Sequence, residues 1–196
     1  LWEIGKPDDD NAEFALAPDG YAQFEDDAFF VVGASEPKKD WPYVQPGPAD
    51  GWAGARPHTF IVLFGVKTPP PTGECRLLFD LIDTQNAGPP KLRVEVNGRV
   101  FEQALPKGAG DASVFGRPKM GREHKFAVAF PAHLLKRGDN EVRVTTLSGS
   151  WMLYDSLVLA TPPGAELCQV QSQTLLESVK PVRALQEQDG RMSQPL

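Results

Sequence analysis

Three aromatic side chains lie close together in one long, proline-rich segment of this 196-residue chain. Trp41, Tyr43 and Trp52 fall within residues 36–57, where prolines fix several backbone torsions and glycines permit sharp turns. A long loop of this kind is usually functional when it is ordered. A flat aromatic face can pack on the apolar face of a sugar ring while its polar edge stays hydrated. The segment therefore predicts a rigid platform on which a sugar can stack.

Polar side chains that suit sugar hydroxyls flank these aromatic rings. Gln45 and Asp50 can accept hydrogen bonds, and Arg56 and His58 can donate them. The alternative is structural, in which the tryptophans pin the loop onto the body of the protein and touch no ligand. The candidate carbohydrate-binding residues are Trp41, Tyr43, Asp50, Trp52, Arg56 and His58.

A second cluster, near the start of the chain, is acidic. Asp8, Asp9, Asp10 and Asn11 follow one another, and Glu13 comes two residues later. Carboxylate and amide oxygens are the ligands that Ca²⁺ prefers, and it takes six to eight of them. The spacing is not that of an EF-hand loop, and a solvent-exposed acidic turn is the alternative. The cluster thus marks a candidate calcium site whose remaining ligands must come from elsewhere.

No pattern of a catalytic centre stands out in the chain. Glycoside hydrolysis needs two carboxyl groups flanking the scissile bond, and Asp80, Asp83, Glu95 and Glu102 form no distinctive pair. The three histidines are scattered without metal-binding spacing, and the G-x-S-x-G nucleophile motif is missing. We therefore expect no catalysis within this chain, with a small polysaccharide lyase or glycoside hydrolase as an open alternative.

The elements that must position these residues are short strands. Phe60, Val62 and Phe64 alternate with other residues, which is the period of a half-buried strand. Asn97-Gly98 between two such runs is typical of a type I′ hairpin. Many strands, frequent turns and little helix signal predict an all-β antiparallel sandwich or barrel. We expect strands at 13–16, 28–32, 58–66, 75–82, 91–96, 99–103, 125–130, 141–147 and 151–159.

Charge and length limit the possible partners. The net charge of −6 argues against nucleic-acid binding, and no apolar run is long enough to span a bilayer. Cys75 and Cys168 are expected to be free thiols. The chain begins at Leu1 with no signal-peptide pattern, so we expect a part of a longer protein.

The domain organisation is expected to change near residue 160. The run Ala160 to Gly164 has the composition of a boundary, because it holds two prolines and a glycine. Residues 1–160 are predicted to form one module. Residues 161–196 are predicted to be a linker followed by a fragment of another β domain, or a C-terminal extension. A turn at Asp189-Gly190 would open a hairpin there.

Two motifs in the first 160 residues resemble a known family. Trp2-Glu-Ile-Gly5-Lys-Pro-Asp8 and Gly149-Ser-Trp151-Met-Leu-Tyr154-Asp155 resemble the two ends of the C-terminal domain of family 4 polysaccharide lyases, the rhamnogalacturonan lyases. Similar modules accompany bacterial glycoside hydrolases. The resemblance implies an antiparallel jelly-roll β-sandwich of the galactose-binding-like type. It also implies a structural calcium between the first and last strands, held here by Glu13 and Asp155.

The resemblance also implies a function. The lyase's catalytic residues belong to a separate domain that nothing in this chain matches. We therefore expect a non-catalytic carbohydrate-binding module that targets a polysaccharide-degrading enzyme to a plant-type glycan. Its partners would be a polysaccharide or oligosaccharide and a neighbouring catalytic domain, with no nucleic acid and no membrane, in a secreted or periplasmic protein. A structural spacer packed against a catalytic domain is the alternative.

Overall fold

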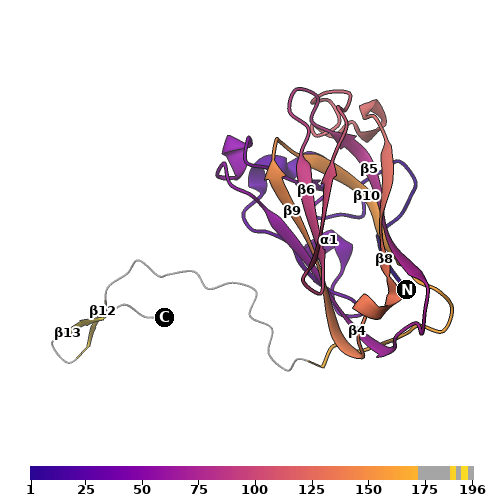
Figure 1. The fold of residues 1–196 in the computed structure, drawn as a ribbon. Helices are drawn as coiled ribbons and strands as arrows, with labels where there is room; N and C mark the ends of the chain where they lie inside the picture. The colour runs from indigo at the N-terminus through magenta and orange to yellow at the C-terminus, as the bar shows by residue number, and fades with distance from the viewer. Residues whose placement is uncertain (172–185, 189–190, 194–196) are drawn as a thin grey trace.

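The computed structural model describes residues 1–171, 186–188 and 191–193, and its main body is a sandwich of two sheets (Figure 1). The first sheet has the order β1-β10-β5-β8, and β3 also pairs with β10. The second has the order β11-β4-β9-β6-β7, and β2 also pairs with β4. The first sheet contains β1 (Trp2–Gly5), β3 (Val44–Gln45), β5 (Glu74–Thr84), β8 (His124–Pro131) and β10 (Met152–Ala160). The second contains β2 (Phe29–Val31), β4 (Thr59–Thr68), β6 (Lys91–Val96), β7 (Arg99–Ala104), β9 (Gly138–Ser148) and β11 (Glu166–Cys168).

The pairing confirms the all-β jelly-roll sandwich expected from the sequence. Every pairing between these strands is antiparallel except that of β2 with β4, which is parallel. The helices of the described residues are all single turns, in agreement with the weak helix signal. They are η1 (Gly20–Gln23), α1 (Pro37–Asp40), η2 (Gly51–Ala53), η3 (Pro118–Met120) and η4 (Ala132–Leu134). None of the helices in this described part is long and apolar enough to cross a membrane.

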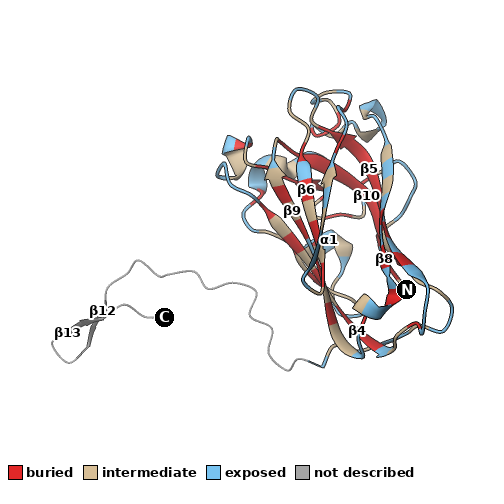
Figure 2. Ribbon diagram, in the orientation of Figure 1, coloured by how far each residue is buried: buried red, intermediate tan, exposed pale blue. Residues whose placement is uncertain are grey.

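The core lies between the two sheets, as the buried positions along the strands show (Figure 2). Phe60, Val62 and Phe64 of β4 are fully buried, as their alternation predicted. Leu153 of β10 and the preceding Trp151 are buried in the same core cluster. Each such side chain contributes about 1.5 to 3 kcal/mol when it leaves water. Alternation in the sequence thus located the inner face of the strands correctly.

The segment 13–16 is a correction, because the strand expected there does not form. Ala15 makes one isolated bridge to Pro42, and the chain turns at Leu16, whose φ is 64°. Positive φ interrupts an extended strand. Phe14 is nevertheless fully buried, so its apolar character reflects core packing within a turn. The first strand lies earlier, at Trp2–Gly5, and pairs with the last half of β10.

The hairpin predicted at Asn97-Gly98 is present. β6 and β7 pair with Val96 opposite Arg99, and both turn residues have positive φ, 48° and 84°. This is the type I′ conformation, which asparagine followed by glycine adopts at low cost.

Both cysteines are free, as expected, and Cys75 is buried.

The C-terminal part differs in one respect from the expected boundary at residue 160. β11 pairs antiparallel with β4, so the sandwich continues to Cys168. Further along, β12 (Gln186–Gln188) pairs with β13 (Arg191–Ser193), as a hairpin around Asp189-Gly190 requires. The two turn residues lie outside the described residues.

Candidate functional site

Several loops at one end of the sandwich form a hollow lined by aromatic rings, here called the aromatic pocket. Its volume is about 250 Å³. Tyr21 packs edge-on against Trp52 with 5.2 Å between ring centroids, and its other neighbour, Phe115, lies 5.4 Å away. Phe115 is 53% exposed, and the other two rings are half-buried. The lining consists of Tyr21, Asp50, Trp52, Gln85, Asp111, Val114, Phe115, Ser150 and Trp151.

Asp50 ties the Trp52 side of the aromatic pocket to the β9–β10 loop. Its carboxylate accepts hydrogen bonds from the Ser150 hydroxyl at 2.5 Å and from the Gly47 amide at 2.8 Å. Burial raises the pKa of Asp50, and hydrogen bonds from Gly47, Ser150 and Trp52 partly offset that effect. Asp50 therefore acts first as a structural anchor and only secondarily as a group facing the hollow.

The Phe115 side of the aromatic pocket is held by Asp83, which is fully buried at the end of β5. Its carboxylate accepts hydrogen bonds from the Ala109 amide at 2.9 Å and from the Ser113 hydroxyl at 2.6 Å. The Tyr43 hydroxyl donates to the carbonyl of Val114 at 2.7 Å. Residues 106–117, which have little regular structure, are thus fixed from beneath by two buried polar side chains.

The sequence-based candidates for sugar binding fall into different environments. Trp41 and Tyr43 are fully buried, and Trp41 packs edge-on against Phe60 and Tyr154. Neither ring has an exposed face on which a sugar can stack. Their burial corresponds to the structural alternative, in which aromatics pin the loop to the core. Trp52 is the aromatic of this loop that remains partly exposed, and it lines the aromatic pocket.

His58 and Arg56 are not among the residues lining the aromatic pocket. His58 is fully buried, with Nδ1 2.5 Å from Asp27 Oδ1 and Nε2 3.0 Å from the Ala53 carbonyl. Arg56 is exposed and donates to both oxygens of Asp27. Gln45 is also buried, where its amide donates to backbone carbonyls. These polar groups position η2 and Trp52 by internal contacts.

Some of the pocket residues were missed in the sequence. Tyr21 and Asp111 come from loops far from Trp52 in the chain. Phe115 is an apolar residue in a polar, glycine-rich stretch, and Trp151 belongs to the motif Gly149 to Asp155. Single aromatics in separate loops carry no spacing signal, because the tertiary fold alone brings them together.

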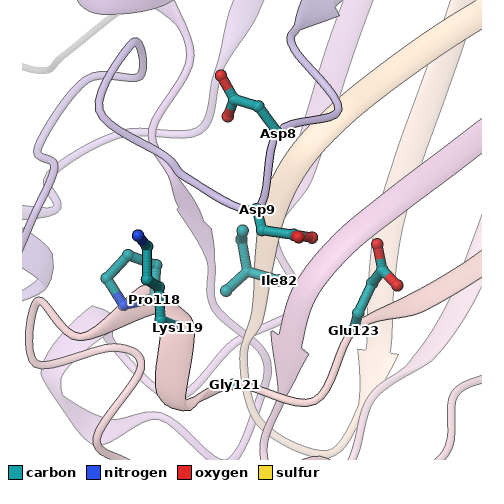
Figure 3. Close-up of a pocket in the computed structure, with 7 residues that line it drawn as sticks. All are labelled: Asp8, Asp9, Ile82, Pro118, Lys119, Gly121 and Glu123. Carbon is teal, nitrogen blue, oxygen red and sulfur yellow. The ribbon is translucent and has the colours of Figure 1, made fainter.

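A larger hollow, of about 460 Å³, opens on another part of the surface and is here called the acidic pocket (Figure 3). Asp8 and Asp9 come from the loop after β1, and Glu123 from the segment before β8. Lys119 of η3 and Ile82 of β5 contribute further lining, together with Pro118 and Gly121. The acidic run near the N-terminus therefore shares this pocket with Glu123, an acidic residue far away in the sequence.

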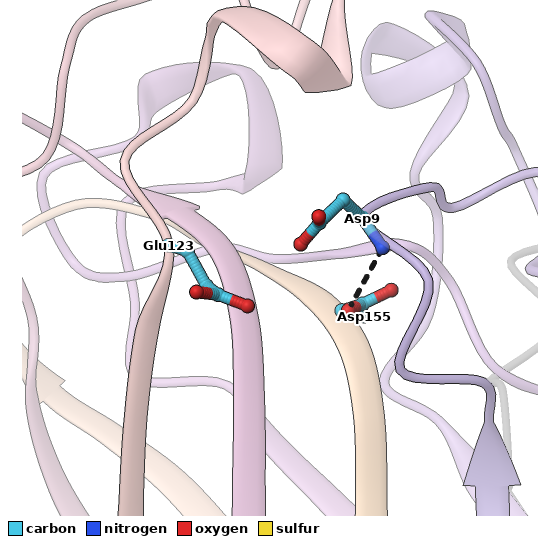
Figure 4. Close-up of side chains that lie close together, drawn as sticks. All are labelled: Asp9, Glu123 and Asp155. Atoms are coloured by element: carbon cyan, nitrogen blue, oxygen red, sulfur yellow. Dashed lines mark hydrogen bonds between the residues drawn. The ribbon is translucent and has the colours of Figure 1, made fainter.

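Three carboxylates converge beside this pocket, as Figure 4 shows. Oxygen atoms of Asp9, Glu123 and Asp155 all lie within 4.8 Å of one another. Asp155 is buried and accepts hydrogen bonds from the backbone amides of Asp8, at 3.4 Å, and Asp9, at 3.2 Å. Burial raises the pKa of Asp155 to about 6, and the nearby Asp80 and Asp8 charges add to that effect. The site therefore disfavours the ionised form of the buried Asp155 carboxyl group.

Asp80 and Lys125 border the carboxylate cluster. The Lys125 ammonium lies 2.9 Å from Asp80 Oδ2 and 2.6 Å from Glu123 Oε1. Asp80 is 6% exposed, and its Oδ1 has no hydrogen-bond partner among the described residues. One lysine thus serves a cluster with more carboxylates than it can neutralise. This donor set suits a hard cation that prefers oxygen ligands.

Glu13, the expected partner of Asp155, does not belong to that cluster. The carboxylates that meet Asp155 are those of Asp9 and Glu123. Glu13 is half-buried, and its Oε1 has no hydrogen-bond partner within the described residues. Asp155 and the acidic run were candidates from the sequence, and the fold brings Asp155 and Asp9 together. Glu123 was not a candidate, because nothing in the sequence links the segment before β8 to the acidic run.

The fold defines the class first: the described residues form a jelly-roll β-sandwich. The family follows from a profile match. Residues 1–159 match the family described as "CBM-like: Polysaccharide lyase family 4, domain III", and the chain belongs to this family. The resemblance seen in the two end motifs is thereby confirmed.

A curated relative supports the same assignment. The chain is 27% identical over 172 residues to the rhamnogalacturonate lyase of Dickeya dadantii (strain 3937). The match covers 83% of this chain and 28% of that enzyme, so the chain spans little more than a quarter of the relative's length.

Solved family 35 carbohydrate-binding modules are also similar. The module of Cellvibrio japonicus Abf62 matches with a TM-score of 0.36 and 14% identity, over 59% of this chain and 71% of that one. A family 35 module solved with a glucuronic acid-containing disaccharide matches with a TM-score of 0.38 and 13% identity, over 59% and 72%.

Proposed function

We propose that this chain is a non-catalytic carbohydrate-binding module that holds a polysaccharide-degrading enzyme on a plant-type glycan. The observation that carries the proposal is the aromatic pocket, in which Tyr21, Trp52 and Phe115 present partly exposed rings around a hollow of about 250 Å³. Rings supply stacking surfaces, and carboxylate, amide and hydroxyl groups at the rim can pair with sugar hydroxyls. The family match to a lyase domain supports the partnership with a catalytic domain.

Tethering explains how such a module serves an enzyme without chemistry of its own. A bound module raises the local concentration of glycan around a catalytic domain on the same chain. Since polysaccharides of plant walls lie outside bacterial cells, the proposal implies a secreted or periplasmic protein. The competing function is that of a structural spacer. A spacer would not need the exposed aromatic rings that line the aromatic pocket.

The aromatic pocket is tested by removing its exposed rings. We expect Trp52→Ala and Phe115→Ala to weaken glycan binding roughly 10-fold or more, about 1.4 kcal/mol, while the sandwich stays folded. Affinity electrophoresis and calorimetry on a panel of plant polysaccharides measure the effect. Val100→Ala, which truncates an exposed apolar residue on β7, is the matched control.

Two results would contradict the proposal. If the wild-type module is retarded by no glycan on the panel, the spacer becomes the better description. If the pocket variants bind as tightly as the wild type, the ligand lies elsewhere. Release of unsaturated or reducing products by the isolated chain would instead favour a small lyase or hydrolase.

We further propose that Asp9, Glu123 and Asp155 hold a structural Ca²⁺ between the loop after β1 and β10. The unpartnered, buried Asp80 Oδ1 at the border of this cluster supports the proposal, because a nearby cation would offset its charge. In this position calcium would cross-link the N-terminal loop to β10 and leave the aromatic pocket untouched.

The calcium proposal predicts a cation-dependent melting temperature. At a concentration 100-fold above its dissociation constant, Ca²⁺ should stabilise the protein by about 2.7 kcal/mol, and chelator should reverse this. Asp155→Asn should lose the response, and Glu3→Gln, an exposed acid on β1, should keep it. Equal melting curves in calcium and in excess chelator, with no metal in elemental analysis, would contradict the calcium proposal.

A further inference from the structure

The charged groups of the aromatic pocket are all of one sign. Asp50 and Asp111 line it, and none of its lining residues is a lysine or arginine. Asp111 is exposed, and its carboxylate makes no hydrogen bond or ion pair within the described residues. An acceptor-only group of this kind can receive hydrogen bonds from hydroxyls but can offer none to an anion.

The other walls of the pocket do not compensate this charge. Gln85 and Ser150 are neutral; Gln85 Oε1 accepts the Gly88 amide at 2.6 Å, and the Ser150 hydroxyl donates to Asp50. Arg56, the arginine of residues 36–57, donates to Asp27 and is not among the lining residues. Asp19 touches the same region, since its Cβ lies 3.3 Å from a Cβ built at Gly116. Asp19 thus adds one negative charge near the pocket, and no lysine or arginine is among the lining residues.

We infer that the aromatic pocket selects neutral sugar residues and excludes uronates. This inference rests on the proposed function and narrows it to a substrate class. A galacturonate differs from a galactose by a carboxylate in place of the C6 hydroxymethyl group. In this pocket that carboxylate would face Asp111 and Asp50 without a cation to pair with, and like charges in a partly dry site repel. A neutral hydroxymethyl group would instead donate a hydrogen bond to Asp111.

The test compares matched ligands that differ only at that group. Calorimetry is run with trimers of galacturonate and with the same trimers after carboxyl reduction, and with neutral galactose, arabinose and xylose oligomers. All measurements use buffer depleted of divalent cations, so that no metal bridges two carboxylates. We expect at least one neutral oligomer to bind 10-fold or more tightly than any uronate. Raising the salt concentration should narrow the gap, because it screens the repulsion.

Charge variants identify the source of the discrimination. Asp111→Asn should raise uronate affinity at least several-fold and change neutral affinity less. Glu3→Gln changes the net charge equally but lies opposite Val158, at the far end of β10 from Trp151, so it should leave the ratio unchanged.

The possible outcomes separate the two proposals. Uronates that bind as tightly as neutral oligomers, with both lost in Trp52→Ala, would overturn the neutral-sugar selectivity while the glycan-binding function stands. An unchanged ratio in Asp111→Asn would also overturn it. Absence of binding by any oligomer or polysaccharide would instead refute the proposed function itself.

Discussion

At the scale of single residues, Asp27 connects the aromatic loop to the sandwich. Its carboxylate accepts hydrogen bonds from Arg56, from His58 and from the Thr59 amide at 3.0 Å. The other ring nitrogen of His58 faces the Ala53 carbonyl, which can only accept. The position of η2, and with it Trp52, therefore depends on a network centred on one acidic side chain.

This network predicts sensitivity to acid. Burial opposes ionisation of Asp27, but hydrogen bonds from His58, Arg56 and Thr59 outweigh it and lower the pKa. A lowered carboxyl pKa stabilises the fold fully above its unfolded value, near 3.8, and this contribution is lost as pH falls through the folded value. Urea unfolding from about pH 6 to pH 3 should show this loss in the wild type.

Asp27→Asn should remove part of that pH dependence. The variant should be less stable at neutral pH by about 3 kcal/mol, because His58 and Arg56 lose a charged partner. Between about pH 5 and pH 3 its stability should fall less than that of the wild type. Glu25→Gln, an exposed neighbour, is the control and should follow the wild-type profile. Parallel pH profiles for Asp27→Asn and the wild type would show that the network does not control acid stability.

The sequence showed that this loop is rich in aromatic residues, but it did not show which of their rings are buried. Trp41, Tyr43 and Trp52 share an aromatic, proline-rich context, yet only Trp52 retains exposed surface. Whether a ring points into the core depends on which strand the loop crosses, and spacing within the loop carries no information about that. The same reason explains why Tyr21 was not foreseen, since it reaches Trp52 from a different loop.

At the scale of elements, the positions of the regular strands could be predicted from their sequence pattern. The conformation of the irregular loops instead depends on buried polar side chains that hydrogen-bond to them. β4 and β6 appear where alternation placed them, because each buries one face and leaves the other only partly buried. The segment 106–117 carries no such pattern. The conformation of this segment depends on hydrogen bonds to Asp83. The sequence does not reveal this role, because only the folded chain places the end of β5 beneath the loop. The Phe115 wall of the aromatic pocket is therefore set by contacts that only the fold creates.

Gly108 tests this anchoring. A Cβ at this position would lie 1.8 Å from the Thr84 carbonyl oxygen and 2.1 Å from Asp83 Oδ1. Gly108→Ala should thus push the loop off its anchor, at about 1 to 3 kcal/mol in stability, and weaken glycan binding as the Phe115 wall moves. Gly88→Ala, where a Cβ would meet nothing within 4 Å, should leave urea unfolding and glycan affinity unchanged. If both alanine variants bind and unfold alike, the loop is not held through Gly108.

At the scale of the whole molecule, the sequence located the sandwich but ended it one strand early. The prolines after Ala160 have the composition of a linker, and the chain does turn there. The three residues of β11 are too few to show a period, so their pairing with β4 could not be inferred from alternation. Closing the sheet at this edge depends on a long-range contact.

β11 is therefore predicted to stabilise the whole module although it contains only three residues. Gly65 of β4 faces it so closely that a Cβ there would lie 2.6 Å from the carbonyl oxygens of Cys168 and Gln169. The Gln171 amide also donates to Asp139 at 2.8 Å. A chain ending at residue 161 loses these contacts, whereas a chain ending at 171 keeps them. With a few exposed strand hydrogen bonds at about 1 kcal/mol each, the shorter chain should be less stable by about 2 kcal/mol, or about 4 to 8 °C in melting temperature.

Gly65→Ala in the chain ending at 171 provides an independent check on the same contact. Its methyl group should displace β11 and reproduce most of the loss, while the same substitution in the chain ending at 161 should cost much less, because no strand is left to displace. Differential scanning calorimetry of the four chains completes the cycle, and the interaction between the two changes measures the contribution of β11. Additive effects of truncation and substitution would mean that β11 does not press on Gly65, and the sandwich would then end at β10.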